Sequence, residues 1–552
     1  MNKDTRKILG FPFHPVLFCV YPILYVYTRN IMFIPFDQTY RFLAISLCFT
    51  ICYLLILRIL MKSWDKAGVL TSLLLIQLFS FGQIANVIEQ WMSQQGHALN
   101  YSILAWLWLT IYALACAGVV KAKVPQNTSV YLNLIGIVLV IFPLTSILSS
   151  MTASERGGES ENEILSEIRG EAQAVSPRHE TPLPEMPDIY YIILDAYTRA
   201  DVLREFYDYD NTVFLDALED RGFFIVEESR SNYMNTTYSL NTSLNLLYFH
   251  EIPLSIFRQA RYDLQTNYVN QFLRDQGYKV VVFDSGTGDT NNQYADIFLS
   301  PNPPRADNGH DLNPFEHLML RTTIALLFYE QDFQSESTAR ISEGFINSVN
   351  HELDVRRERI RFTLNHLPDY ATRDGHYFVF AHIYLPHFPF LYGPNQKALE
   401  YHQNVNLFWY EVEPENYVEF YGYQLDYLNQ ALMPTIDSIL ANTEKPLVII
   451  IQGDHGDEKY LDWDAPDARG VNARSAILNA IYFSDGNYAL LYPTMTPVNT
   501  FRVIFNKWFD TQYPLLPDRS YFHEHSLSTP YNKKPEFTDI CAEFDICLPG
   551  PP

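Results

Sequence analysis

Five apolar stretches within the first 150 residues constrain this chain more than any other feature of its sequence. They cover roughly residues Phe11–Tyr27, Phe42–Leu60, Val69–Ile88, Ile103–Val120 and Val130–Leu148. Each approaches the ~20 residues that an α-helix needs to cross a hydrocarbon core of ~30 Å. The pattern therefore predicts five membrane-spanning helices. Because no small-residue cleavage site follows the first stretch, we expect a retained helix there and not a signal peptide.

Basic residues in the short connections predict the orientation, because membranes retain Lys and Arg on the cytoplasmic side. Three segments share this character: Lys3, Arg6 and Lys7 precede the first span, Lys62 and Lys66 follow the second, and Lys121 and Lys123 follow the fourth. Arg29 and Arg41 flank an opposite loop, so the asymmetry is incomplete. Five spans with the N-terminus inside place everything after Leu148 outside the cytoplasm.

The chain carries 63 Asp and Glu against 39 Lys and Arg, and its net charge of −24 is concentrated after the apolar stretches. A surface of this sign argues against nucleic acid as a partner, since phosphate binding needs basic groups. A small anionic substrate held by a metal stays compatible with it. In an oxidising compartment Cys541 and Cys547 form either a local disulfide or two free thiols.

Composition divides the chain into three parts. Residues 1–150 are the predicted transmembrane domain. Residues 151–187 are polar, rich in Glu and Ser and then in Pro, and predict a tether that buries too little apolar surface to fold alone. Residues 188–552 are the predicted soluble domain.

The soluble part alternates strand and helix patterns. Short runs of β-branched and aromatic residues predict strands at Ile189–Leu194, Lys279–Phe283, Tyr377–Ile383 and Leu447–Ile451. Helical patterns cover Thr212–Arg221, Tyr268–Gln276, Ala339–Leu367 and Tyr423–Asn442. Alternation of this kind predicts an α/β fold, with a mainly parallel sheet between two layers of helices.

Two acidic signatures follow predicted strands. Asp195 ends the first strand, and Asp454-His455-Gly456 follows the last. The carboxyl ends of parallel strands meet at one edge of a sheet, so these side chains are expected to meet there. Two carboxylates and an imidazole suit Zn²⁺, Mn²⁺ or Mg²⁺, and ligand type alone does not choose among them. The structural alternative is that each Asp caps the following helix.

A hydroxyl-rich segment supplies a candidate nucleophile about 40 residues after Asp195. It contains Thr236, Thr237 and Ser239. Metal coordination activates such a hydroxyl without a separate base. The alternative is a helix cap, and both roles are compatible, because a helix N-terminus also stabilises a bound phosphate. Either Thr236 or the adjacent Thr237 fits the nucleophile.

Three further side chains are candidates for binding a substrate. His382 lies near the end of the Tyr377–Ile383 run and His387 follows it closely, and an imidazole there can donate a hydrogen bond to a substrate anion or protonate a leaving oxygen. Of the two, His387 is the stronger candidate. Arg199 faces either the substrate or the solvent. A buried structural histidine is the alternative for both imidazoles.

In this order and spacing, Asp195, Thr236, His387 and the Asp454-His455 pair resemble the motifs of the alkaline phosphatase and sulfatase superfamily. Within it the chain is similar to lipoteichoic acid synthases and lipid A phosphoethanolamine transferases, which join five spans to an extracytoplasmic catalytic domain. The resemblance implies one divalent metal ion bound by Asp195, Thr236, Asp454 and His455, and leaves a second ion open. It implies that Thr236, with Ser239 three positions on, is the nucleophile and that His387 binds the substrate phosphate. Ser239, His382 and Arg199 are further candidate substrate contacts.

The chain also departs from those families. The transferases place Glu where this chain has Asp195, and they carry a further His where it has Trp463-Asp-Ala-Pro-Asp-Ala-Arg469. The Cys-x-Pro-x-Arg type motif of working sulfatases is missing after residue 188, which disfavours sulfate ester hydrolysis.

The resemblance implies a multi-pass protein of the bacterial inner membrane with a periplasmic catalytic domain. Its expected reaction is transfer of a phosphoethanolamine or phosphoglycerol type of group from a phospholipid donor to an envelope glycan or glycolipid. Two alternatives remain: a phosphodiesterase or phosphatase of the same fold, and a non-catalytic component of an envelope polysaccharide machine.

Overall fold

A computed structural model of the chain describes most of its residues. The described ranges are 10–29, 36–93, 101–122, 124–125, 127–170, 186–254, 257, 264, 267–287, 290–292, 295–301, 314–323, 343–400, 416–523 and 534–548. The chain divides into two compact units. The helical unit combines Met1–Glu159 with Ala306–Ile341, and the sheet unit combines Ser160–Arg305 with Ser342–Pro552.

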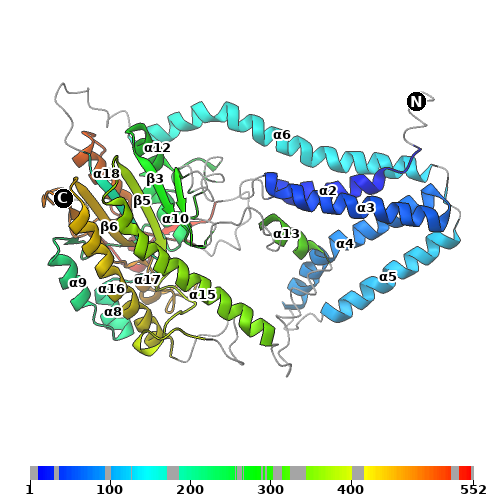
Figure 1. The fold of residues 1–552 in the computed structure, drawn as a ribbon. Coiled ribbons are helices and arrows are strands. Elements are labelled where there is room, and N and C mark those ends of the chain that lie inside the picture. Colours follow the sequence, from blue (N-terminus) through cyan, green and yellow to red (C-terminus); the bar gives the residue numbers. More distant parts are fainter. Residues whose placement is uncertain are drawn as a thin grey trace. The chain divides into compact units, whose positions relative to one another are not determined.

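The helical unit contains the apolar stretches. Its helices are α2 (His14–Arg29), α3 (Tyr40–Met61), α4 (Trp64–Ser93), α5 (Tyr101–Lys121), the first part of α6 (Thr128–Arg169) and α13 (Pro314–Thr322), with the 3-10 turn η1 (Phe36–Thr39) (Figure 1). Four helices, α3 to α6, are long and apolar enough to cross a membrane. In α3, α5 and α6 the apolar side chains are largely exposed, as expected of surfaces that face lipid, whereas half of the apolar window of α4 is buried.

The prediction of five spans is corrected to four among the described residues. The first apolar stretch forms α2, which has 16 residues and contains Pro22. At 1.5 Å per residue such a helix is about 24 Å long, which is short of the ~30 Å hydrocarbon core. Its apolar content was visible in the sequence, but its ends were not.

One end of the helical unit gathers the basic connections. The ammonium of Lys66, at the start of α4, donates to the carbonyl of Val120 near the end of α5, at 2.7 Å. Ser129, at the start of α6, donates to Asp65 at 2.6 Å. The end of α3, the start of α4, the end of α5 and the start of α6 therefore share one end, which also carries Lys62.

The sheet unit is built on a seven-stranded sheet. Its strands are β1 (Asp188–Leu194), β2 (Phe224–Ile225), β3 (Lys279–Phe283), β4 (Ile297–Leu299), β5 (Tyr377–Ile383), β6 (Leu447–Gly453) and β7 (Asn479–Phe483). The order is β2-β7-β6-β1-β5-β3-β4, parallel from β6 to β4, while β7 pairs antiparallel with both β6 and β2. The predicted strands correspond to β1, β3, β5 and β6, and the predicted α/β class is confirmed.

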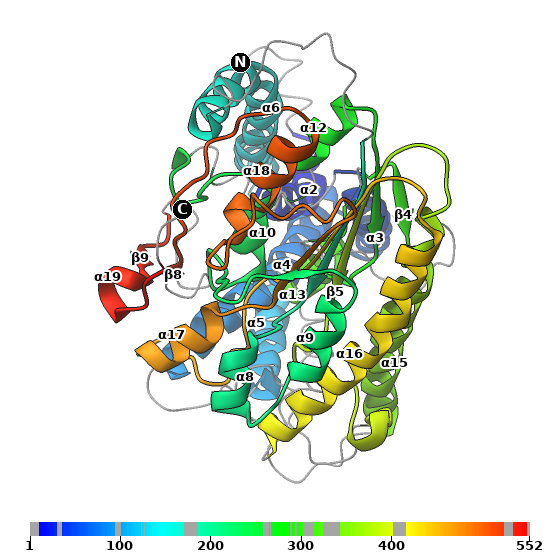
Figure 2. The same ribbon diagram turned by 90° about the vertical axis from the view of Figure 1, so that its left-hand side faces the viewer.

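Helices cover both faces of this sheet (Figures 1 and 2). One face carries α8 (Ala200–Tyr207), α9 (Thr212–Glu219), α15 (Glu343–His366) and α16 (Tyr417–Asn442). The other carries α10 (Thr236–Asn245), α12 (Tyr268–Asp275) and α18 (Pro497–Trp508). Successive β1 residues alternate between the two cores, with Tyr190 in one and Tyr191 in the other. A strand buried on both faces reads as an unbroken apolar run, which is why β1 was evident in the sequence.

The remaining elements are short. They are α17 (Ala468–Ser475), α19 (Ile540–Phe544), the 3-10 turns η2 (Leu367–Tyr370) and η3 (Pro394–Gln396), and a hairpin of β8 (Tyr521–His523) with β9 (Phe537–Asp539). Near the C-terminus, Cys541 and Cys547 form a disulfide, the first of the two alternatives.

The structure differs from the prediction of a tether over residues 151–187. Its first part continues α6 as helix to Arg169, and most of the rest lies outside the described residues. The end of the helix is anchored to the sheet unit. Arg169 donates to the carbonyl of Asn245 at 2.9 Å, and its own carbonyl accepts from the buried Arg502 at 3.2 Å. Composition alone did not show these contacts, which form between residues far apart in the sequence.

Candidate metal and phosphoryl-transfer site

Strand register brings the two acidic signatures together. Strands β1 and β6 are parallel neighbours, and Leu194 pairs with Gly453. The next residues, Asp195 and Asp454, therefore leave the same edge of the sheet side by side. His455 follows at once, and all three side chains are at most 2 % exposed. They form the one group of His, Cys, Asp and Glu within the described ranges whose ligand atoms all lie within 4.8 Å of one another.

The fourth member of the site comes from α10. Thr236 is the first residue of that helix, and Asn235 caps it by accepting from the backbone N–H of Tyr238 at 2.9 Å. Thr236 Oγ1 lies 3.2 Å from His455 Nε2. Thr236 is half-buried, whereas the three acidic and imidazole groups are buried. The hydroxyl thus lies at the accessible side of the cluster, at a helix N-terminus, whose dipole favours an anion.

The imidazole of His455 is oriented for metal binding. Its Nδ1 lies 2.9 Å from the carbonyl oxygen of Gly456, which can only accept a hydrogen bond. The proton is therefore on Nδ1, and Nε2 presents a lone pair toward the carboxylates. Asp454 is oriented in the same way, because its Oδ1 accepts from the backbone N–H groups of Ala196 and His455 at 3.1 and 2.9 Å.

The geometry of this cluster fits a divalent cation. Asp195 Oδ1 and Asp454 Oδ2 are buried and have no hydrogen-bond partner among the described residues. They lie 3.7 and 3.4 Å from His455 Nε2. Around a tetrahedral Zn²⁺ with bonds of about 2.1 Å, neighbouring ligand atoms lie about 3.4 Å apart. Two unsatisfied buried carboxylate oxygens would be costly without such a cation, and the mixed oxygen and nitrogen donors suit Zn²⁺, Mn²⁺ or Mg²⁺.

His382 supports the first metal ligand. Its Nε2 lies 3.2 Å from Asp195 Oδ2, and its Nδ1 lies 2.9 Å from Thr290 Oγ1. Burial alone would raise the pKa of Asp195, but His387, His382 and His455 outweigh it and hold that pKa well below its usual range. The carboxylate is therefore ionised at any physiological pH. An imidazole that orients a ligating carboxylate is a common supporting contact in metal sites.

His387 lies on the accessible side. It is half-buried, its backbone N–H donates to the carbonyl of Asp195 at 3.2 Å, and its ring centre lies 6.1 Å from that of His455. Its ring also lies against Tyr384, with the ring centres 4.7 Å apart. These contacts place the imidazole of His387 beside the cluster, and its contact with a substrate stays a prediction.

Two predicted substrate contacts have other partners in the structure. Ser239 is 1 % exposed, and its hydroxyl donates to the carbonyl of Asp454 at 2.6 Å, so it positions a metal ligand. The guanidinium of Arg199 is paired with Asp201 at 2.7 Å and donates to the carbonyl of Ser229 at 3.0 Å. These last contacts place Arg199 in the turn before α8. The structure gives no support for a substrate-binding role of Ser239 or of Arg199.

Arg474 is a further residue of the site, and no motif in the sequence predicts it. It is buried in α17, donates to the carbonyls of Met234 and Gly456, and places Nη2 3.4 Å from His455 Nε2. Burial and then this guanidinium lower the pKa of His455 below its ordinary 6.5. No motif marks Arg474, because its approach depends on how α17 packs.

Comparison with known proteins gives only distant likenesses. No family model matches the chain, and no curated protein matches it. Among solved structures, the zinc complex of the periplasmic domain of EcEptC from Escherichia coli is 12 % identical, with a TM-score of 0.40 over 65 % of this chain and 96 % of that one.

Two further solved structures are similarly distant. The integral membrane lipooligosaccharide phosphoethanolamine transferase A from Neisseria meningitidis is 11 % identical, with a TM-score of 0.35 over 90 % of this chain and 95 % of that one. The phosphonate monoester hydrolase of Agrobacterium radiobacter is 11 % identical, with a TM-score of 0.35 over 61 % and 80 %. Values this low carry no weight for the activity of this chain.

Proposed function

We propose that this chain is a membrane-anchored, metal-dependent phosphotransferase that moves a phospho-substituent through a covalent intermediate on Thr236. The observation that carries the proposal is the placement of Thr236 Oγ1 at a helix N-terminus, 3.2 Å from His455 Nε2 and at the open side of two buried carboxylates. A hydroxyl in that place is next to the ligands of one divalent cation. The same placement favours Thr236 over Thr237 as the nucleophile.

The residues would divide the reaction into two displacements. In the first, Thr236 Oγ1 forms a bond to phosphorus while the bond from phosphorus to the donor alcohol breaks, and that alcohol leaves with a proton. In the second, an acceptor hydroxyl forms the new bond to phosphorus, the bond to Thr236 breaks, and the threonine hydroxyl regains a proton.

Each side chain has a separate task in this scheme. Asp195, Thr236, Asp454 and His455 would hold the cation, which when bound lowers the pKa of the hydroxyl and offsets phosphoryl charge. His387, whose Nδ1 lies 2.5 Å from the carbonyl oxygen of Phe388, would donate from Nε2 in its imidazolium form to a phosphoryl oxygen or to the leaving oxygen. The first-turn N–H groups of α10 would stabilise the negative charge that builds up during transfer.

The membrane helices support a lipid as one substrate. With α3 to α6 as spans, the end that carries Lys62, Lys66 and Lys121 would face the cytoplasm. Helix α6 starts at that end, so its continuation toward β1 would emerge on the opposite side. This orientation does not depend on whether α2 crosses the membrane. It would place the sheet unit outside a bacterial inner membrane. A phospholipid donor and an envelope glycan or glycolipid acceptor, with phosphoethanolamine or phosphoglycerol as the group, fit that location.

The test is mass spectrometry of envelope lipids and glycans from cells that express the native chain, Thr236→Ala or the matched control Thr237→Ala. We expect a phosphorus-containing substituent that is lost in the first variant and retained in the second, and its mass identifies the group. Identical profiles for all three, with native protein expressed and metal-loaded, would contradict transfer to envelope acceptors. Release of the same group to water without any acceptor would favour the phosphodiesterase alternative.

A further inference from the structure

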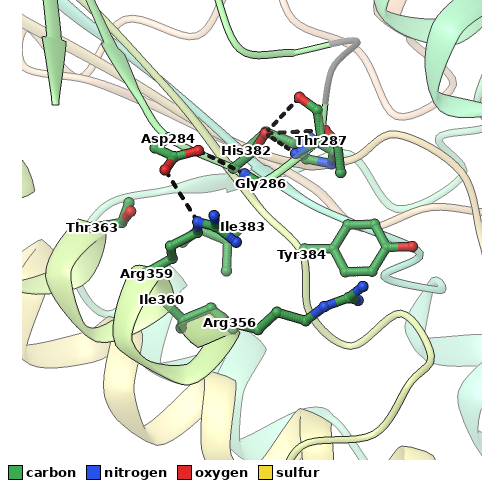
Figure 3. A pocket seen from close by; sticks show the side chains of 11 residues that line it. Asp284, Gly286, Thr287, Arg356, Arg359, Ile360, Thr363, His382, Ile383 and Tyr384 are labelled. Carbon is green, nitrogen blue, oxygen red and sulfur yellow. Dashed lines mark hydrogen bonds and ion pairs between the residues drawn. The ribbon is translucent and has the colours of Figure 1, made fainter. Parts of the chain in front are cut away.

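A cavity of about 200 Å³ lies beside the metal cluster, between α15 and the ends of β3 and β5 (Figure 3). Two arginines of α15, Arg356 and Arg359, line it, and so does His382, which contacts Asp195 from the other side. A water molecule occupies about 30 Å³ of liquid, so the cavity has room for a polar headgroup. Nothing in the phosphoryl-transfer scheme above uses these two arginines.

One side of the Arg359 guanidinium is hydrogen-bonded to the protein. Its Nε donates to Asp284 Oδ2 at 3.1 Å. The same carboxylate accepts from the backbone N–H of Gly286 and from the side chains of Asn291 and Ser300, at 2.7 to 2.9 Å. With four donors around it, Asp284 serves as a fixed support. Among the described residues, no hydrogen bond occupies Nη1 or Nη2 of Arg359, so its outer edge is available to a ligand.

Gly286 allows this placement. Its φ is +81°, which disfavours any side chain, and a Cβ built there would lie 2.6 Å from Arg359 Nη1. The guanidinium thus lies directly against the backbone turn after β3. A larger residue at position 286 would displace the guanidinium from the cavity wall.

Arg356 adds a second positive charge. It lies three residues before Arg359 on the same helix, a spacing that puts both side chains on one face. Its guanidinium carbon lies 5.3 Å from the ring centre of Tyr384, and Figure 3 shows it extending toward that ring. Among the residues that line the cavity, these two guanidinium groups stand against one carboxylate, that of Asp284. Planar guanidinium groups of this kind recognise phosphate and carboxylate oxygens.

The cavity wall is continuous with the metal cluster. His382 Nδ1 lies 2.9 Å from Thr290 Oγ1, which in turn lies 2.8 Å from the hydroxyls of both Ser285 and Thr287. On its other side His382 Nε2 lies 3.2 Å from Asp195 Oδ2. One imidazole therefore separates the arginine pair from a metal ligand, a separation that one substrate molecule can span.

We propose that this cavity is a second anion subsite, which holds a phosphate or carboxylate group of the molecule that donates or accepts the phospho-substituent. The inference rests on the proposed transferase function for its role in catalysis. Binding of the anion itself does not depend on turnover.

The binding test uses full-length protein in detergent, treated with a chelator and titrated with inorganic phosphate by calorimetry. The native chain and Arg361→Gln, an exposed control on the same helix, should bind phosphate alike. Arg359→Gln and Arg356→Gln should each weaken binding by about 10-fold or more, as expected when a charge-assisted hydrogen bond is lost. Equal phosphate binding by all four proteins, or no binding by any, would overturn the subsite.

A kinetic test identifies which substrate carries the anion. In metal-loaded enzyme, Arg359→Gln should raise the KM for one substrate by about 10-fold with little change in kcat, since the residue binds a remote group. A rise for the lipid donor alone assigns the subsite to the donor, and a rise for the acceptor alone assigns it to the acceptor. Unchanged KM values for both would overturn the subsite. A protein that transfers nothing but still loses phosphate binding in Arg359→Gln would contradict the proposed function and retain the subsite.

Discussion

At the scale of single residues, the site depends on which atoms are left without partners. Buried Asp195 Oδ1 and Asp454 Oδ2 face the lone pair of His455 Nε2, and Thr236 supplies a hydroxyl at that point. The sequence predicted all four residues, because each follows a strand or begins a helix in a readable motif. It did not predict Arg474, and it assigned Ser239 and Arg199 to the substrate, because such contacts depend on packing between distant segments.

The Arg474–His455 contact predicts how metal binding depends on pH. A lowered pKa keeps His455 Nε2 unprotonated below pH 6.5, so the protein should retain its metal on acidification past that value. In Arg474→Gln the lost positive charge raises the pKa of His455, and metal release should move to higher pH, whereas Arg474→Lys keeps the charge and should stay near the native protein. The measurement is metal content after dialysis between about pH 4 and pH 8. The same midpoint pH of metal release in all three proteins would contradict the predicted effect of Arg474 on His455.

At the scale of elements, the strands could be predicted from the sequence, but the packing of helix α17 against the site could not. Runs such as Tyr377–Ile383 are buried on both sheet faces, so their apolar character appears directly in the sequence. Helix α17 is short and polar in composition, yet its backbone lies against the Asp-His-Gly turn: a Cβ on Gly456 would lie 2.1 Å from the carbonyl oxygen of Ala473. The fit between this turn and α17 fixes His455.

Gly456→Ala tests that fit. The substitution should lower the free energy of unfolding by on the order of 3 kcal/mol, since the new methyl group meets backbone that cannot move alone. Gly422→Ala in α16 is the matched control, because its Cβ would make only ordinary contact with Tyr209 and alanine favours a helix. Thermal unfolding in detergent measures the stability of both variants. Equal melting temperatures for the two variants would show that the turn tolerates a side chain.

At the scale of the whole molecule, a segment distant in sequence belongs to the helical unit. Helix α13 lies between β4 and α15 in the chain, yet its Phe315 and Met319 are fully buried among residues of α2 and α4, and its Glu316 pairs with Arg41 at the start of α3. The predicted boundary after residue 187 did not include this return, because a nine-residue helix gives no sign of its partner.

The proposed orientation predicts which residues a membrane-impermeant maleimide reaches in cells whose outer membrane has been permeabilised. A cysteine at Val213, which is 82 % exposed on the sheet unit, should be labelled. A cysteine at Lys62, in the connection between α3 and α4, should be labelled only after the inner membrane is opened. Labelling of Lys62→Cys in intact spheroplasts would reverse the topology and place the site in the cytoplasm.

The most direct measurement is tandem mass spectrometry of purified, metal-loaded protein that has been incubated with phospholipid and quenched before acceptor is added. We predict a phospho-substituent on the peptide that contains Thr236, located on Thr236 and not on Thr237, which disappears when acceptor is supplied and never forms in metal-depleted protein. Transfer to acceptor with Thr236 unmodified at every time point, or a substituent on Thr237, would contradict the covalent mechanism that the site geometry supports.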